Sequence, residues 1–149
     1  MHRWDDFARE AGELAERGRR LLYQFGPGLA FLATVDRAGA PRLHPIVVAQ
    51  ERGGLYAFLV PSPKRRDLER DPRYALHAFP PEEVDDEFAL RGEARRVDDP
   101  AIREALAAAV AFDVGDDQDL YEFLIDSALL AEYEHRGQWP PAYTTWTSA

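Results

Sequence analysis

The first 24 residues carry apolar side chains at intervals of three and four residues, with charged side chains between them. This spacing is typical of an amphipathic helix that packs one face against a core. The next residues, "FGPG", contain a proline and glycines, which interrupt a helical hydrogen-bond ladder. The pattern therefore predicts an N-terminal helix over residues 1–24.

The pattern then changes to that of strands. Apolar runs and alternating segments, separated by turn-forming clusters such as "DRAGAP" and "ERGG", predict barrel strands within residues 29–97, at 29–35, 42–50, 55–60, 73–79 and 87–97. Pro45 lies inside the second of these strands. Because proline cannot donate to a ladder, we expect this stretch at a sheet edge, at a bulge, or where the backbone turns toward a ligand.

Two helices are predicted between and after these strands. Residues 64–71 form a short one, with Ser62 available as N-cap and Pro63 at its first position. Residues 98–112 form another, with an aspartate cap and Pro100 in the first turn.

The C-terminal part, residues 120–149, is less clear. Residues 120–134 fit one helix by propensity and a hairpin by their alternation, and we favour strands. The threonine-rich "TTWTS" that follows has β character. Several antiparallel strands with two or three helices predict one α+β barrel domain over residues 1–149.

Composition limits the class of protein. A chain of 149 residues fits one domain, and the absence of cysteine excludes disulfides and thiolate metal sites. The N-terminus is charged, and no apolar run approaches the roughly 20 residues that span a bilayer, so a cytoplasmic protein without a membrane segment is expected. A net charge of -9 argues against a nucleic-acid partner.

Most familiar catalytic and metal-binding motifs are missing. The four histidines show no metal-ligand spacing such as HExxH, and the acidic residues 113–119 lack the glycine and glutamate of an EF-hand loop, so no metal site is expected. No GxSxG, Walker or GxGxxG motif is present. His44 stands out among the histidines because it precedes the proline inside a strand.

Lys64 is the only lysine among the 18 basic residues, and it lies where a strand gives way to a helix. The backbone N–H groups of a helix N-terminus, the Ser62 hydroxyl and the Lys64 ammonium group could together bind a phosphate. A solvated charge on an exposed helix is the alternative.

Three segments in order, 28–48, 54–76 and 87–97, carry a resemblance to a known family. Their strand, turn, "H-P" strand, strand and "SPKRRDLERDPR" are similar to the pattern of the pyridoxamine-5′-phosphate-oxidase-like, FMN-binding split β-barrels. The resemblance implies an antiparallel, Greek-key-like split β-barrel with flanking helices. It also implies a homodimer with flavin sites in the two clefts between subunits.

The resemblance also implies roles for residues. Ser62 and Lys64 would meet the FMN phosphate, with Arg65 or Arg66 nearby. The backbone of the second strand would face the flavin ring, along His44, Pro45, Ile46 and Val47. The ribityl chain would lie near Leu59 and Val60. No catalytic side chain is identified, and His44 is the first candidate.

Three functions follow. The first is an FMN-dependent oxidoreductase acting on a small molecule of unknown identity. Pyridoxamine phosphate is disfavoured as that molecule, since no further basic cluster near the C-terminus would hold its phosphate. The second is a deazaflavin-dependent reductase, because the acidic tail of a deazaflavin would suit an arginine-rich groove. The third is a non-enzymatic dimer without flavin, which "FLVP" in place of hydroxyl residues and Asp67 in place of asparagine would favour.

Overall fold

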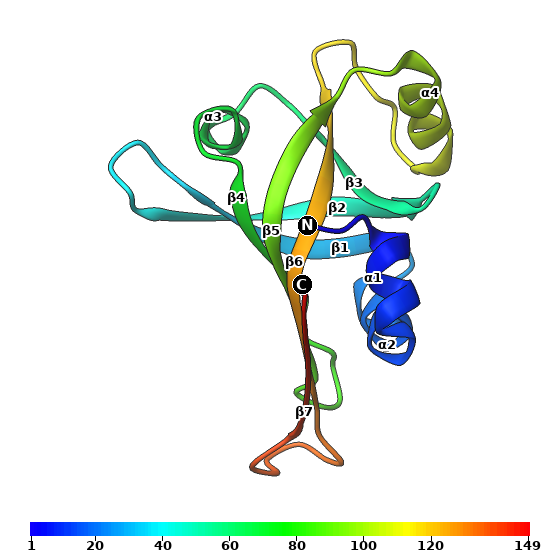
Figure 1. Ribbon diagram of the computed structural model, residues 1–149, viewed down its shortest axis with the longest axis vertical. Coiled ribbons are helices and arrows are strands. Elements are labelled where there is room, and N and C mark those ends of the chain that lie inside the picture. Colours follow the sequence, from blue (N-terminus) through cyan, green and yellow to red (C-terminus); the bar gives the residue numbers. More distant parts are fainter.

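The computed structural model describes residues 1–149 and contains an antiparallel β-barrel with four flanking helices (Figure 1). The helices are α1 (Trp4–Glu10), α2 (Gly12–Leu22), α3 (Pro63–Arg70) and α4 (Pro100–Ala109). The strands are β1 (Gly28–Val35), β2 (Pro41–Glu51), β3 (Gly54–Leu59), β4 (Arg73–Ala78), β5 (Glu87–Val97), β6 (Asp119–Glu132) and β7 (Ala142–Thr147). None of the helices combines the length and apolar character that crossing a membrane requires. The predicted α+β split barrel is confirmed.

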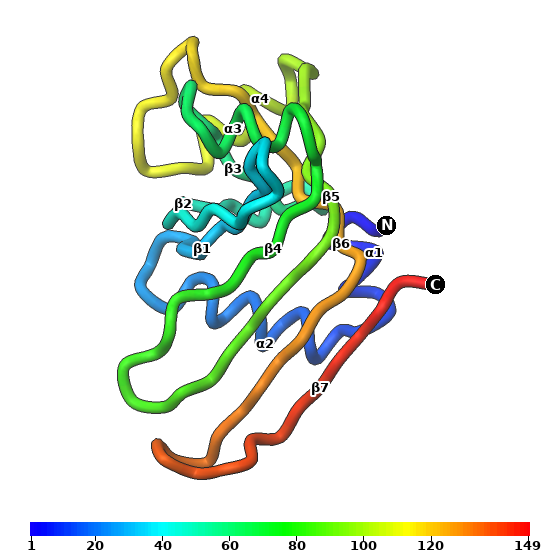
Figure 2. The backbone as a smooth tube through the Cα atoms, turned by 90° about the vertical axis from the view of Figure 1, so that its left-hand side faces the viewer, coloured from blue at the N-terminus to red at the C-terminus, as the bar shows by residue number.

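The barrel is closed by the longest strand, β6. Strands pair in the order β3-β2-β1-β4-β5-β6-β7, and β3 also pairs with β6, so six strands form a ring. Residues 119–122 of β6 pair with β3, and residues 127–132 pair with β7. Figure 2 shows β4 to β7 running side by side in front of α2.

The inside of the barrel is set by alternation along the strands. In β1, buried and half-buried side chains alternate, so that Ala30, Leu32 and Thr34 face inward. Directly paired residues point to the same side of a sheet, so their partners on β2 face inward as well. These partners are Ile46, His44 and Arg42.

Helix α2 covers the inward face of the sheet beside β5. Gly18 allows this close approach, because a Cβ atom there would lie 2.2 Å from the ring of Phe88. Phe7 of α1 and Leu22 of α2 are fully buried in the same core. The helices therefore seal the side of β5 that faces the core.

The single N-terminal helix predicted over residues 1–24 is wrong, because the structure has two. Ala11 leaves the helical region at φ −136° and ψ 58°, and its N–H still bonds to the carbonyl of Phe7. Gly12 follows and has little preference for the helix interior. The break lets Phe7 and Leu14 both reach the core.

Residues 120–132 form strand, as favoured over helix, but they belong to the single long strand β6 and do not form a hairpin. Pairing with β5 along nearly its whole length overrides the helix propensity of this segment. The helix predicted over 98–112 is shorter, since Val110 is already extended after α4.

Of the three places expected for Pro45, the structure shows the sheet edge. Strand β2 pairs with β1 over residues 41–48, but with β3 only over residues 49–51. On the side away from β1, the backbone of residues 41–48 therefore has no strand partner. We refer to this stretch as the open edge of β2.

A buried carboxylate ties the N-terminus to the barrel. Glu122 on β6 is only 2% exposed and accepts hydrogen bonds from Arg3 Nε and from Arg95 Nη2, both at 2.6 Å. Arg3 also donates to the hydroxyl of Tyr56 at 2.9 Å. The backbone of His2 pairs with Ile125, so the chain start is held beside β6.

Replacing Glu122 by alanine should lower the free energy of unfolding by roughly 2–4 kcal/mol, since two guanidinium groups lose their buried partner. The matched control is Glu132→Ala on the same strand, whose carboxylate pairs with Arg17 at the surface. That change should cost less than about 1 kcal/mol. Urea denaturation measures both, and equal losses would contradict the role assigned to Glu122.

Candidate functional site

The turn from β3 into α3 places a helix N-terminus at one end of the barrel. Ser62 occupies the N-cap position with extended backbone angles, and Pro63 is the first helical residue, as predicted. The Ser62 hydroxyl, however, donates to the carbonyl of Val60 at 2.8 Å and does not cap the helix. The first-turn N–H groups of α3 are therefore not satisfied by this side chain.

Lys64 lies in the first turn of α3 and is half-buried. Its ammonium group forms no ion pair or side-chain hydrogen bond, unlike most arginines of the chain. Burial alone lowers the pKa of Lys64 below its usual value. An unpaired cation that is partly removed from water favours an anionic ligand.

His44 faces the inside of the barrel near this helix, because it pairs with the buried Leu32. Its Nε2 atom is buried and has no hydrogen-bond partner. Burial, together with the positive charges of Lys64 and Arg42, lowers the pKa of His44. At neutral pH the ring is therefore uncharged, with one nitrogen unsatisfied beside two cations.

Asp67 does not place a free negative charge at this site. Its side chain is almost fully buried and accepts hydrogen bonds from Thr34 Oγ1 and Arg42 Nε at 2.7 Å each, and from Arg70 Nη2 at 3.3 Å. Burial alone would raise the pKa of Asp67, but these three bonds together lower it. The carboxylate is thus compensated where it lies, and it fixes Arg42 and Arg70.

The two arginines after Lys64 point in different directions. Arg65 Nη1 donates to the carbonyl of Asp117 at 2.8 Å and lies 3.5 Å from the carboxylate of Asp119. It therefore holds the loop before β6. Arg66 is exposed and forms no ion pair, so only the second arginine is available to a ligand.

Arg66 lines a polar pocket of about 260 Å³ that has no hydrophobic side chain in its wall. Its lining residues are Arg37, Arg42, Pro63, Arg66, Asp67 and Arg70. We refer to it as the arginine pocket. With four arginines and one aspartate, it is a local concentration of positive charge in an acidic protein.

Sequence reasoning missed the contribution of Arg37, which lies in the β1–β2 turn. It also missed that Arg70, at the end of α3, faces the same pocket as Arg42. The available signal was the "DRAGAPR" hairpin, whose two arginines lie seven and two residues before His44 of the "H-P" pair.

The other predicted ligand residues divide between the two faces of β2 and the end of β3. Ile46 is buried inward with His44, whereas Pro45 and Val47 alternate onto the outer face. Leu59 is buried in the core, and Val60 is 43% exposed just beyond it. The structure thus brings Pro45, Val47 and Val60 to the surface and leaves Ile46 and Leu59 inside.

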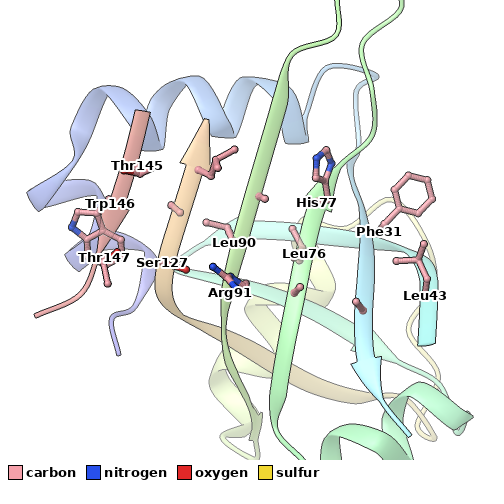
Figure 3. A pocket seen from close by; sticks show the side chains of 15 residues that line it. Phe31, Leu43, Leu76, His77, Leu90, Arg91, Ser127, Thr145, Trp146 and Thr147 are labelled. Carbon is pink, nitrogen blue, oxygen red and sulfur yellow. The ribbon is translucent and has the colours of Figure 1, made fainter. Parts of the chain in front are cut away.

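The outer face of the sheet beside β2 is apolar and carries a cavity of about 420 Å³ (Figure 3). It extends from Phe31 and Leu43 at one end to Thr145 and Thr147 at the other. Across six strands, one row of paired residues runs through Leu43, Ala33, Ala75, Arg91, Ser127 and Thr147. Leu43 is 65% exposed, and no segment of the chain covers this row. We call this surface the outer face.

A closed six-stranded barrel of this topology defines the class of split β-barrel proteins. Residues 20–132 match the family described as pyridoxamine 5'-phosphate oxidase, and the chain belongs to this family.

Solved structures with the same fold carry different descriptions. A heme binding protein from Mycobacterium smegmatis superposes with a TM-score of 0.67 at 18% identity, covering 87% of this chain and 56% of that one. A NimC/NimA family protein from Clostridium acetobutylicum superposes with a TM-score of 0.65 at 18% identity, covering 88% of this chain and 92% of that one. The heme storage protein HutZ from Vibrio cholerae superposes with a TM-score of 0.60 at 16% identity, covering 74% of this chain and 89% of that one.

The chain spans little more than half of the Mycobacterium smegmatis protein. No curated protein sequence matches it. At these identities the likeness establishes the fold and leaves the ligand open.

The environment of His44 gives a testable titration. Its imidazole should titrate below the ordinary value of about 6.5 in NMR spectra, and added inorganic phosphate should raise this pKa by offsetting Lys64 and Arg42. Lys64→Ala should also raise the pKa of His44. It should do so only in part, because the burial of the imidazole remains. Folding lowers the pKa of His44. The free energy of unfolding should therefore fall as the pH drops below the pKa that this histidine has in the unfolded chain.

The control for this titration is Arg19→Ala, which removes a cation from the surface of α2 and should leave the His44 titration unchanged. If neither phosphate nor Lys64→Ala moves the His44 resonance, the proposed proximity of cations and imidazole is wrong.

Proposed function

We propose that the protein binds FMN along the open edge of β2 and at the start of α3, and that it is an FMN-dependent oxidoreductase of a small molecule. The observation that carries this proposal is the unpaired, half-buried Lys64 at a helix N-terminus next to a strand edge without a partner. Membership of the pyridoxamine 5'-phosphate oxidase family supports it.

The residues at the start of α3 fit the phosphate group of FMN. A phosphate dianion needs converging donors and at least one fixed cation. Lys64 supplies the cation, the first-turn N–H groups of α3 supply donors, and Arg66 is free to approach from the arginine pocket. Asp67 does not oppose the dianion, because Arg42 and Arg70 already compensate its charge.

The residues along β2 fit the flavin ring of FMN as well. Pro45 and Val47 present an apolar surface on the outer face of β2, and the open edge offers backbone N–H and C=O groups to the polar rim of a flavin. Bound FMN would supply hydride transfer, while this chain would bind and orient it. We assign no catalytic side chain. His44 lies at the phosphate end, where its unsatisfied Nε2 could hold a hydrogen bond to the anion.

We further propose that the protein is a homodimer, with the outer face as its interface. The face spans six strands, is lined mainly by apolar and small side chains, and has no cover within the chain. A two-fold contact would place the same patch of both copies against each other. It would also enclose the ring end of the cofactor site, because Leu43 and Pro45 border both regions.

Ala33→Glu should convert the dimer into monomers, because it places a charge between Leu43 and Ala75 on this face. Ala101→Glu, at an exposed position of α4, is the matched control and should leave the dimer intact. Size-exclusion chromatography with light scattering measures the mass. A wild-type protein with the mass of one chain would contradict the proposal.

A deazaflavin is the second candidate cofactor. The arginine pocket favours it, because four guanidinium groups beside the phosphate end could accept an extended acidic tail. FMN ends at its phosphate and has no group that would occupy the whole pocket.

Lys64→Ala should weaken FMN binding by about 10- to 100-fold, the effect of removing a charge-assisted hydrogen bond to the phosphate. The control is Arg73→Ala, which removes a cation that lies beyond α3 and already pairs with Asp71. Quenching of flavin fluorescence measures both. Equal affinity of the two variants would remove Lys64 from the site.

Parallel titrations of the wild type separate the alternatives. Saturation by a deazaflavin alone would replace FMN as the cofactor. Saturation by neither would support the flavin-free dimer.

A further inference from the structure

A second cavity lies on the outer face of β2, beside Val47 and away from the arginine pocket. It has a volume of about 330 Å³. Its walls are Tyr23, the loop 26–28, residues 47–49 of β2 and residues 109–111 at the end of α4. We call it the α4 cavity.

The α4 cavity continues the surface that would carry the flavin ring. Side chains alternate along a strand, so Pro45, Val47 and Ala49 lie on the same face of β2. Pro45 and Val47 form the proposed ring surface, and Val47 also lines the cavity. A molecule in the cavity would therefore lie next to the ring end of the cofactor, remote from Lys64.

The walls of the cavity are firmly placed. Gly28 lies so close to β2 that a Cβ atom there would be 2.2 Å from the carbonyl oxygen of Val48. The Tyr23 hydroxyl accepts a hydrogen bond from the N–H of Gln50 at 2.7 Å. These contacts fix the loop before β1 against β2.

The chemistry of the α4 cavity is opposite to that of the arginine pocket. Seven of its ten lining residues are hydrophobic, and none is charged. Arg19, which contacts the lining residue Tyr23, is already engaged, since its guanidinium lies over the Tyr23 ring at 4.7 Å and its Nε donates to Gln50 at 3.1 Å. A phosphate or carboxylate placed here would lose water without gaining a partner.

We propose that the α4 cavity binds an uncharged, apolar molecule of one or two rings. Resting on the proposed function, we assign this molecule as the substrate of the flavin site. The volume lies near the lower limit of small-molecule pockets, which suits a compact ring system. A phosphorylated substrate such as pyridoxamine phosphate is excluded by the same walls.

The test compares 2-naphthol with 2-naphthyl phosphate, which share a ring system and differ in the charged group. Isothermal titration calorimetry measures both ligands, with and without saturating FMN. We expect 2-naphthol to bind at least about tenfold more tightly than the phosphate. A phosphate that binds equally or more tightly would overturn the inference.

Ala109→Trp should fill the cavity from an exposed position of α4 and weaken 2-naphthol binding at least about tenfold. Ala108→Trp is the matched control, since this neighbouring exposed residue does not line the cavity, and it should leave binding unchanged. Equal effects of the two variants would overturn the assignment of the cavity. So would a change in oligomer mass with Ala109→Trp alone, which would make this surface a subunit contact.

The outcomes separate this inference from the proposed function. If FMN binds and 2-naphthol does not, the inference fails and the cofactor proposal stands. If 2-naphthol binds and responds to Ala109→Trp while FMN does not bind, the cavity is upheld as an apolar binding site and its role as a substrate site is overturned.

Discussion

The pairing of β6 with β3 is the contact on which the rest of the structure depends. Without it, the sheet would be an open ribbon, and with it six strands close into a barrel that has few free edges. Closure fixes the connection from β3 into α3 at one end of the barrel. It also leaves the first part of β2 paired with β1 alone, because β3 turns away to meet β6. The helix N-terminus and the open edge that form the candidate site are both consequences.

Positive charge is concentrated around α3, although the protein as a whole is negatively charged. The chain carries a net charge of -9, yet five arginines and one lysine lie on or beside α3. Asp67 makes this possible, since its buried carboxylate holds Arg42 and Arg70 in place and leaves Lys64 and Arg66 unpaired. The same structure keeps charge out of the α4 cavity. Two neighbouring surfaces of opposite chemistry therefore meet along β2, one suited to an anion and one to an apolar ring.

Sequence patterns predicted the strands and α3, because alternation and turn residues act locally, and they limited Pro45 to an edge, a bulge or a turn toward a ligand. They failed at Ala11, where tertiary packing breaks a helix that propensity would continue. The positions of Ser62 and Lys64 at the start of α3 were predictable, because the Ser-Pro step marks a helix N-terminus locally. The partner of Arg65, the inward direction of His44 and the contribution of Arg37 were not, because they depend on segments that closure of the barrel brings together.

The absorption spectrum of the freshly purified protein tests the central claim most directly, because a cofactor held in the cell travels with the protein. The account predicts the near-ultraviolet and blue bands of an oxidised flavin, with release of FMN on denaturation. A Soret band would contradict it and place the protein with its heme-binding structural neighbours. A colourless protein that also remains colourless after incubation with FMN and desalting would contradict it equally.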